Sequence, residues 1–183
     1  MKTHPLIDRE FIHASPFLKR ILDEFKKDLE VQDCLDIPAG NGRNTFLLAA
    51  HFKKVTAIDI NDQYLTAIER NKGAYLNSKR ISTVQADILK DIPIQTDAHD
   101  FICNIHFYDE ALTGQLIKEM KKGALLLLET PGCQGENYKI LPAEKDLDGA
   151  LQGCEILIKE FRSCPHQSNG DKKGALKMLI RKC

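Results

Sequence analysis

The sequence predicts an α/β protein with a doubly wound, seven-stranded sheet that is mostly parallel and carries an antiparallel C-terminal strand. Short apolar segments alternate with helix-forming segments from residue 31 to residue 130, and this alternation is typical of parallel strands joined by helices. Residues 124–129 form an apolar run that ends in an acid, as expected of a strand covered on both faces. Two strand-like segments near the C-terminus flank a run of turn-forming residues, which predicts an antiparallel hairpin at one sheet edge.

The elements of the first half follow from capping residues and from the spacing of apolar residues. Ser15 is a favourable helix cap and Pro16 suits a first helical turn, so we expect a helix from there to about residue 29. The apolar spacing then predicts strands over residues 33–37, 54–59 and 81–86, and helices over residues 43–52 and 61–77.

The second half begins with a segment that favours turns. Residues 88–99 contain several turn formers, so we expect the helix on this crossover to be short or missing. The remaining pattern predicts strands over residues 100–105, 123–129, 154–161 and 174–181, and helices over residues 109–121 and 143–151.

Length and charge limit the expected partners. The 183 residues fit one domain, in which residues 1–30 form a helical segment and possible lid and residues 31–183 form the main body. Lys and Arg together number 26, as do Asp and Glu, so no overall basic field attracts nucleic acid. The sequence has no apolar run of membrane-spanning length and no cleavable signal. We therefore expect no nucleic-acid or membrane partner, and a monomer or homodimer.

The six cysteines are scattered, and no two have the spacing of a zinc-binding pair, so we predict no metal site. Cys34, Cys103 and Cys154 lie in predicted strands and are interpreted as small buried hydrophobic residues. Cys133 lies in a glycine-containing loop, where its thiol is expected to be accessible. We expect reduced cysteines and a cytoplasmic location, because disulfides are rare in that compartment.

The most informative segment is residues 31–50, in which a strand, a tight turn and a helix follow one another. Gly40 and Gly42 allow the turn a left-handed conformation and let a ligand approach bare backbone. The helix that follows directs its unpaired N–H groups to the same place. Asp59 ends the next predicted strand, 17 residues after Gly42, where an acid can accept hydrogen bonds from ribose hydroxyls. The segment therefore predicts a cofactor that contains a nucleoside.

Two classes of cofactor suit such a loop. A dinucleotide-binding loop needs a third glycine, but the chain has Thr45 there, which disfavours an NAD-dependent oxidoreductase. With Asp36 four residues before Gly40, the loop resembles the first motif of class I S-adenosylmethionine-dependent methyltransferases, acid-x-G-x-G-x-G, with Pro38 in place of the first glycine. The resemblance implies a Rossmann-like methyltransferase fold with S-adenosyl-L-methionine as the cofactor.

The resemblance also assigns roles to residues at the strand ends. Asp36 and the glycine loop are expected to hold the methionine portion, Asp59 the ribose, and the residues after the second and third strands the adenine. The expected cofactor-binding residues are Asp36, Pro38, Ala39, Gly40, Gly42, Asn44, Asp59, Ile60, Asp87, Ile88 and Asn104. For Asp59 and Asp87 the alternative is an ordinary turn former or helix cap.

The acceptor is expected near the end of the fourth predicted strand. The segment Asn104-Ile-His-Phe107 lacks the two prolines that enzymes methylating base amino groups carry there, which disfavours methylation of DNA or RNA bases. His106 is a candidate general base, because imidazole titrates near neutral pH. Alternatively, His106 is a turn residue before the next helix.

A closer resemblance is to the tellurite-resistance-type group of small methyltransferases, through Gly40-Asn-Gly-Arg-Asn-Thr45 and the loop at residues 166–170. In that group a histidine of this loop faces the substrate, which makes His166 a second candidate catalytic residue; otherwise it is a surface loop histidine. We predict methyl transfer to a small-molecule thiol, chalcogen oxyanion, amine or hydroxyl. The alternatives are a non-catalytic Rossmann-like domain that binds a nucleotide or a protein, and an enzyme that modifies RNA or protein.

Overall fold

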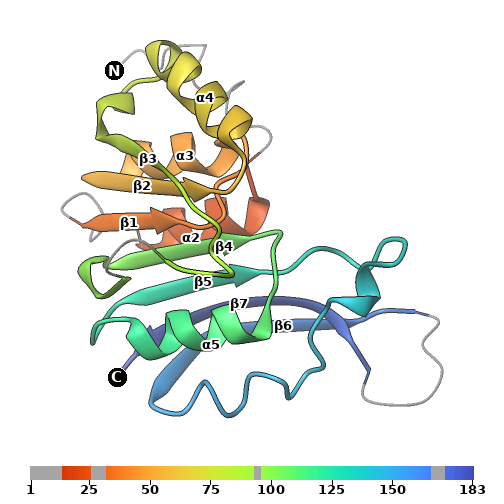
Figure 1. Ribbon diagram of the computed structural model, residues 1–183. Helices are drawn as coiled ribbons and strands as arrows, with labels where there is room; N and C mark the ends of the chain where they lie inside the picture. Colours follow the sequence, from red (N-terminus) through yellow and green to blue (C-terminus); the bar gives the residue numbers. More distant parts are fainter. Residues whose placement is uncertain (1–13, 26–31, 93–95, 166–171) are drawn as a thin grey trace. The chain divides into compact units, whose positions relative to one another are not determined.

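The protein is an α/β protein with a seven-stranded sheet, seen here in a computed structural model that describes residues 14–25, 32–92, 96–165 and 172–183 (Figure 1). Its strands are β1 (Asp33–Asp36), β2 (Lys54–Asp59), β3 (Ile81–Gln85), β4 (Phe101–Ile105), β5 (Leu125–Glu129), β6 (Cys154–Ser163) and β7 (Gly174–Lys182). Its helices are α2 (Pro16–Phe25), α3 (Arg43–His51), α4 (Asp62–Asn71) and α5 (Glu110–Glu119). The strand order β3-β2-β1-β4-β5-β7-β6, with β7 antiparallel, confirms the predicted fold class.

The chain divides into two compact units, residues 1–93 and 94–183. In the first unit, β2 pairs in parallel with both β1 and β3. Parallel strands end at the same edge of a sheet, so the residues that follow β1, β2 and β3 gather at one edge of this unit. Ligands of such sheets bind outside the carboxyl ends of the strands.

The helices of the first unit begin where the sequence predicts, and α3 and α4 end earlier than predicted. The Ser15 hydroxyl oxygen accepts from the N–H groups of Phe17 and Leu18 at 3.1 and 3.2 Å, which confirms the predicted cap of α2. The end predicted near residue 29 lies outside the described residues. The helix α4 stops at Asn71 and not at residue 77, because a 3₁₀ turn follows at Lys72–Ala74. Glycine at position 73 weakens the helix there.

In the second unit, β4 pairs in parallel with β5, and β7 runs antiparallel to both β5 and β6. Since β5 and β6 are both antiparallel to the strand between them, they point in the same direction. The carboxyl ends of β4, β5 and β6 therefore emerge at one edge of this unit. The strand β6 is at the end of the strand order, which confirms the predicted edge hairpin.

The helix predicted over residues 143–151 is wrong, because this segment forms a series of turns. Leu147 and Leu151 are buried and four residues apart, which imitates the spacing of a helix. The Asp146 carboxylate accepts from the backbone N–H of Ala143 at 2.7 Å, and this kind of local hydrogen bond favours turns over helix. The crossover at residues 88–99 holds only a short 3₁₀ helix, Thr96–Ala98, among its described residues, as predicted.

None of the helices that the structure describes is long and apolar enough to cross a membrane. Within the same residues, no three His, Cys, Asp or Glu side chains are grouped so that they could hold a metal ion.

Candidate functional site

The glycine loop between β1 and α3 is held in shape by its own backbone. Gly42 precedes α3 with a left-handed φ of 89°. A Cβ atom built on Gly42 would lie 2.6 Å from Cγ1 of Ile68, so both the backbone conformation and the packing require glycine. The N–H of Gly42 donates to the Ala39 carbonyl at 3.2 Å, and the N–H of Ala39 donates to the Ile58 carbonyl at 2.7 Å. The N–H groups of Gly42 and Ala39 are therefore both used within the protein, where they hold the loop in shape. The peptide bond between Ile37 and Pro38 is cis.

Asp59, at the end of β2, anchors this loop through both carboxylate oxygens. Oδ2 accepts from the N–H of Gly40 and Oδ1 accepts from the N–H of Asn61, each at 2.8 Å. The residue is only 5% exposed. A carboxylate can accept about four hydrogen bonds, so these two contacts leave acceptor capacity for a ligand. Asp59 thus has a definite positioning role in addition to the ribose contact predicted for it.

Gly40 leaves a space beside the loop. Its φ is 55°, and no atom of the described residues lies within 4 Å of a Cβ built on it. A ligand can therefore lie against this part of the backbone, next to the carboxylate that Gly40 itself contacts. The open face of Gly40 and the buried acid beside it fit the nucleoside and amino-acid parts of S-adenosylmethionine.

Substitutions at the two glycines are expected to distinguish a loss of stability from a loss of cofactor affinity. Gly42→Ala introduces left-handed strain and a clash with Ile68, and we expect it to lower the free energy of unfolding by about 2–4 kcal/mol. Gly40→Ala carries the strain alone, about 1 kcal/mol, but places a methyl group where the cofactor is expected. Urea unfolding and calorimetric titration with S-adenosylmethionine measure the two effects. A Gly40→Ala protein that binds as tightly as wild type would contradict the assignment of this face.

Two other predicted cofactor residues have structural partners in the first unit. The buried Asp36 carboxylate accepts from the Thr45 hydroxyl at 2.6 Å, which links the end of β1 to the start of α3. The Asn44 side-chain carbonyl accepts from the backbone N–H of Ser15 at 3.0 Å. The start of α2 is therefore tied to the helix that follows the glycine loop.

The residues after β2 and β3 differ in exposure. Ile60 is 60% exposed and Ile88 is buried, so the Ile60 side chain is accessible to a flat ligand such as adenine. Asp87 accepts from the N–H of Leu89 and pairs with Lys90 at 2.9 Å. The Lys90 ammonium holds the pKa of the Asp87 carboxyl below its ordinary value. These contacts are those of a turn former, which was the alternative interpretation of Asp87.

Asn104, near the end of β4, is a buried polar residue without a hydrogen bond. It is 1% exposed, and neither its amide nitrogen nor its amide oxygen has a partner among the residues that the structure describes. Buried amide groups almost always form hydrogen bonds, so such an exception needs an explanation. A ligand that supplied the missing partners would explain it, and the cofactor contact expected of Asn104 stays a prediction.

A pocket of about 590 Å³ lies in the second unit, at the carboxyl ends of β4 and β5 and beside the β6–β7 hairpin. His106, with a left-handed φ of 61°, lines it directly after β4 and donates its backbone N–H to the Glu129 carbonyl at 2.6 Å. The Glu129 side chain is buried and pairs with Lys177 at 3.3 Å. The remaining lining residues are Thr130, Pro131, Gly132, Gln134, Asn137, Glu160, Phe161, Arg162, Ala175 and Leu176.

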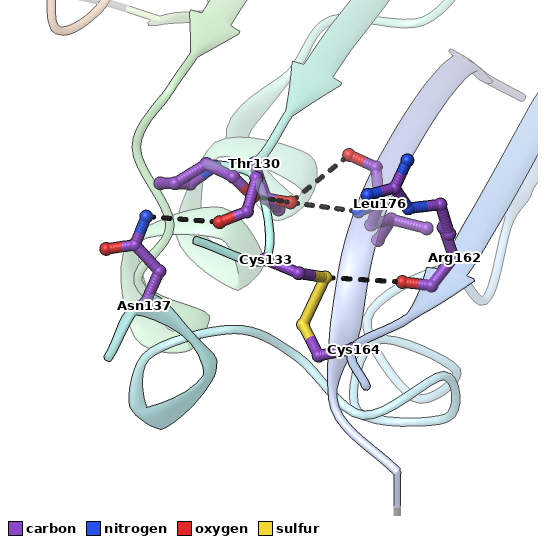
Figure 2. Close-up of a disulfide and its surroundings, with 8 residues drawn as sticks. Thr130, Cys133, Asn137, Arg162, Cys164 and Leu176 are labelled. Carbon is purple, nitrogen blue, oxygen red and sulfur yellow. Dashed lines mark hydrogen bonds between the residues drawn. A yellow bond between two sulfur atoms is a disulfide. The ribbon is translucent and has the colours of Figure 1, made fainter. Parts of the chain in front are cut away.

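A disulfide joins Cys133, in the loop after β5, to Cys164, directly after β6 (Figure 2). The prediction of reduced cysteines is wrong for this pair. Because β5 and β6 point in the same direction on either side of β7, the segments after them emerge side by side. The other cysteines are thiols, and Cys34 and Cys103 are buried as predicted, whereas Cys154 is partly exposed. Burial raises the pKa of the Cys34 thiol well above its usual range.

Comparison with known proteins decides the class of the chain. Residues 34–123 match the family model described as a methyltransferase domain. The chain is an S-adenosylmethionine-dependent methyltransferase. The matched region contains the glycine loop, Asp59 and Asn104, and S-adenosylmethionine is the cofactor of the methyltransferase. Among curated proteins, none matches it in sequence.

Solved structures similar to the methyltransferase share its fold at low sequence identity. TYW2 of M. jannaschii, solved with AdoMet, is 16% identical with a TM-score of 0.59, and the match covers 94% of this chain and 79% of TYW2. The N-methyltransferase NodS of Bradyrhizobium japonicum WM9 is 20% identical with a TM-score of 0.62, covering 100% of this chain and 99% of NodS. TehB of Haemophilus influenzae is 21% identical with a TM-score of 0.63, covering 90% of this chain but only 62% of TehB. The predicted resemblance to the tellurite-resistance-type group therefore holds for the fold.

The structure brings some predicted site residues together and adds others. Gly40 and Asp59 are in direct contact, and His106 lines the pocket, whereas His166 lies outside the described residues. Glu129 and Lys177 were not predicted as site residues; they are opposite each other in the register of β5 and β7. An acid at the end of an otherwise apolar strand was the available signal for Glu129, since charged residues are seldom fully buried without a function or a partner.

Proposed function

We propose that the methyltransferase transfers the methyl group of S-adenosylmethionine to a small-molecule acceptor that binds in the pocket of the second unit. The pocket carries the proposal: its volume of about 590 Å³ is within the range of small-molecule sites, roughly 300–1,000 Å³. Eight of its thirteen lining residues are polar or charged, and Pro131, Phe161, Ala175 and Leu176 supply apolar surface. Its position after β4 and β5 agrees with the edge at which ligands of α/β sheets bind.

The bound cofactor supplies a methyl group activated by attachment to a positively charged sulfur. In our proposal the residues of this chain bind and orient. In the first unit, Gly40 provides the open backbone face, Asp59 accepts from ribose, and Ile60 packs on adenine. In the second unit, Asn104 offers a ligand the amide that lacks a partner. Holding donor and acceptor in line at near-attack distance removes much of the entropic part of the barrier. No covalent intermediate on the enzyme is required.

The charges of the pocket support a polar acceptor. Glu129 and Glu160 contribute two acids, and Arg162 and Lys177 contribute two cations. An amine, a hydroxyl, a thiol or a chalcogen oxyanion can each contact one of these groups. An amine or hydroxyl acceptor must lose a proton during transfer, and His106 is our candidate base.

Methyl transfer to RNA is the main competing function, because some proteins of similar structure act on tRNA. The equal numbers of basic and acidic residues in this chain argue against it. A test incubates the enzyme with methyl-labelled S-adenosylmethionine and four separate acceptor pools. The pools are small thiols with selenite and tellurite, small amines and phenols, bulk tRNA, and protein extract. We expect label in a small-molecule pool; label confined to tRNA or protein would overturn the proposal.

The variant His106→Asn assigns the acceptor class. Loss of a general base reduces the rate by about 10²- to 10⁴-fold, so an amine or hydroxyl acceptor should show such a loss in kcat. A thiol or selenide ionises without help, so its methylation should change less than threefold. The rate of label transfer at saturating cofactor is the measurement. His51→Asn, on α3, is the matched control and should leave both rates unchanged.

A further inference from the structure

We propose that the Cys133–Cys164 disulfide is a redox clamp on the acceptor pocket. Reduction by a dithiol frees one wall of the pocket and lowers methyl transfer, while the cofactor residues of the first unit keep their affinity. The inference rests on the proposed function of the pocket, and it concerns the regulation of that site.

The disulfide joins two walls of the pocket. One wall is the loop after β5, with Gly132 and Gln134 on either side of Cys133 lining the pocket. The other wall is the β6–β7 hairpin, which contributes Arg162, two residues before Cys164. The Cα atoms of the two cysteines are 5.2 Å apart. The bond therefore fixes the distance between two lining segments that are 31 residues apart in the chain.

Hydrogen bonds connect the two ends of this loop to β7 and to the residue before it. At its start, Thr130 exchanges hydrogen bonds with Leu176 of β7: its N–H donates at 3.0 Å and its hydroxyl oxygen accepts from the Leu176 N–H at 2.9 Å. Near its end, the exposed Lys173 ammonium donates to the Lys139 carbonyl at 3.0 Å. The Asn137 amide donates to Gly132 at 3.1 Å, but this contact lies within the loop (Figure 2). Between these ends, the disulfide ties the loop covalently to Cys164, directly after β6.

The surroundings of the two sulfur atoms favour attack at Cys133. Cys133 is partly exposed, whereas Cys164 is buried. Cys133 Sγ lies 3.6 Å from the Arg162 carbonyl oxygen; a disulfide sulfur has no proton, so in the oxidised protein this is a packing contact. The reduced thiol can donate to that carbonyl, although such S–H bonds are weak.

The reduction step conserves atoms and electrons. A thiolate of the dithiol attacks Cys133 Sγ, the Cys133–Cys164 bond breaks, and Cys164 leaves as a thiolate that takes up a proton. The second sulfur of the dithiol then attacks the mixed disulfide and releases Cys133, which is also protonated. Two electrons and two protons pass from the dithiol to the cysteine pair, and the dithiol becomes a disulfide.

Hydrogen exchange of the wild-type protein tests the clamp without a known acceptor. The oxidised protein is compared with protein reduced by tris(2-carboxyethyl)phosphine, a phosphine chosen because a thiol could itself accept a methyl group. Alkylation under denaturing conditions should label four cysteines before reduction and six after it. We expect amides of residues 132–138 to exchange at least tenfold faster after reduction, and those of β1 and β2 to be unchanged. Equal exchange of the loop in both states would overturn the clamp.

The rate of methyl transfer provides a second test of the clamp. Label transfer from S-adenosylmethionine to a mixture of tyramine and selenite, which contains no thiol that would reduce the disulfide, should fall at least fivefold in Cys133→Ser/Cys164→Ser, with less than twofold change in cofactor affinity. Cys183→Ser, which changes an exposed free thiol, is the matched control. Unchanged transfer by the double variant would contradict the clamp. Absence of transfer by every protein would count against the proposed function, while a faster-exchanging loop on reduction would still support the clamp.

Discussion

Asn104→Leu is expected to stabilise the fold while it reduces methyl transfer at least tenfold. The amide of Asn104 is buried at 1% exposure and has no hydrogen-bond partner among the described residues. Leaving a buried polar group unsatisfied costs about 1–3 kcal/mol, and leucine removes this cost with a side chain of similar length. We expect the free energy of unfolding to rise by about 1–3 kcal/mol, which for a chain of this size raises Tm by roughly 2–10 °C.

The matched control is Asn61→Leu, because the Asn61 side chain is satisfied. It accepts from the Gln63 N–H at 2.9 Å as the cap of α4, so its loss should destabilise the protein by about 1 kcal/mol. Thermal unfolding and the rate of label transfer are measured on both variants. An Asn104→Leu protein that is less stable than wild type but fully active would show that Asn104 serves packing alone.

Asp59→Asn is expected to weaken binding of S-adenosylmethionine by at least tenfold. Each carboxylate oxygen of Asp59 accepts a backbone N–H, from Gly40 and from Asn61. Asparagine replaces one oxygen by an NH₂ group, which then faces another donor, so the loop loses an anchor and the ribose loses an acceptor. Removing a hydrogen bond to a charged group costs about 1.5–3 kcal/mol, or roughly 10- to 100-fold in affinity.

The control for this substitution is Asp62→Asn. Asp62 is an exposed acid in the first turn of α4, where its loss should cost only about 0.3–1 kcal/mol of stability through the helix dipole. Calorimetric titration with S-adenosylmethionine is the measurement for both proteins. If Asp59→Asn bound the cofactor as tightly as Asp62→Asn, the ribose assignment would be wrong, and Asp59 would be a loop anchor only.

The sequence predicts those parts of the fold that depend on neighbouring residues. The bounds of β2 agree with the expected 54–59, because alternation and flanking turns act locally. The helix predicted over residues 143–151 was an error because a spacing of four residues between two buried leucines is compatible with a series of turns as well as with a helix. Local spacing does not distinguish these cases when an Asp side chain, here that of Asp146, accepts a hydrogen bond from the backbone.

The glycine loop could likewise be predicted from the sequence, but the pocket could not. Gly40, Gly42 and Asp59 lie within one strand–helix–strand unit, so their proximity follows from spacing. Glu129 and Lys177 meet only through the antiparallel register of β5 and β7, which a single sequence does not specify. The disulfide requires in addition that β7 lies between β5 and β6. The contacts that the sequence did not predict are therefore those between segments that are far apart in the chain.

Calorimetric titration of the purified protein with S-adenosylmethionine tests the central claim most directly, with Gly40→Ala titrated in parallel. We expect saturable binding of one cofactor per chain in the micromolar range, weakened at least tenfold by the added methyl group. The absence of saturable binding by a folded wild-type protein would contradict the assignment of the glycine loop and of the reaction.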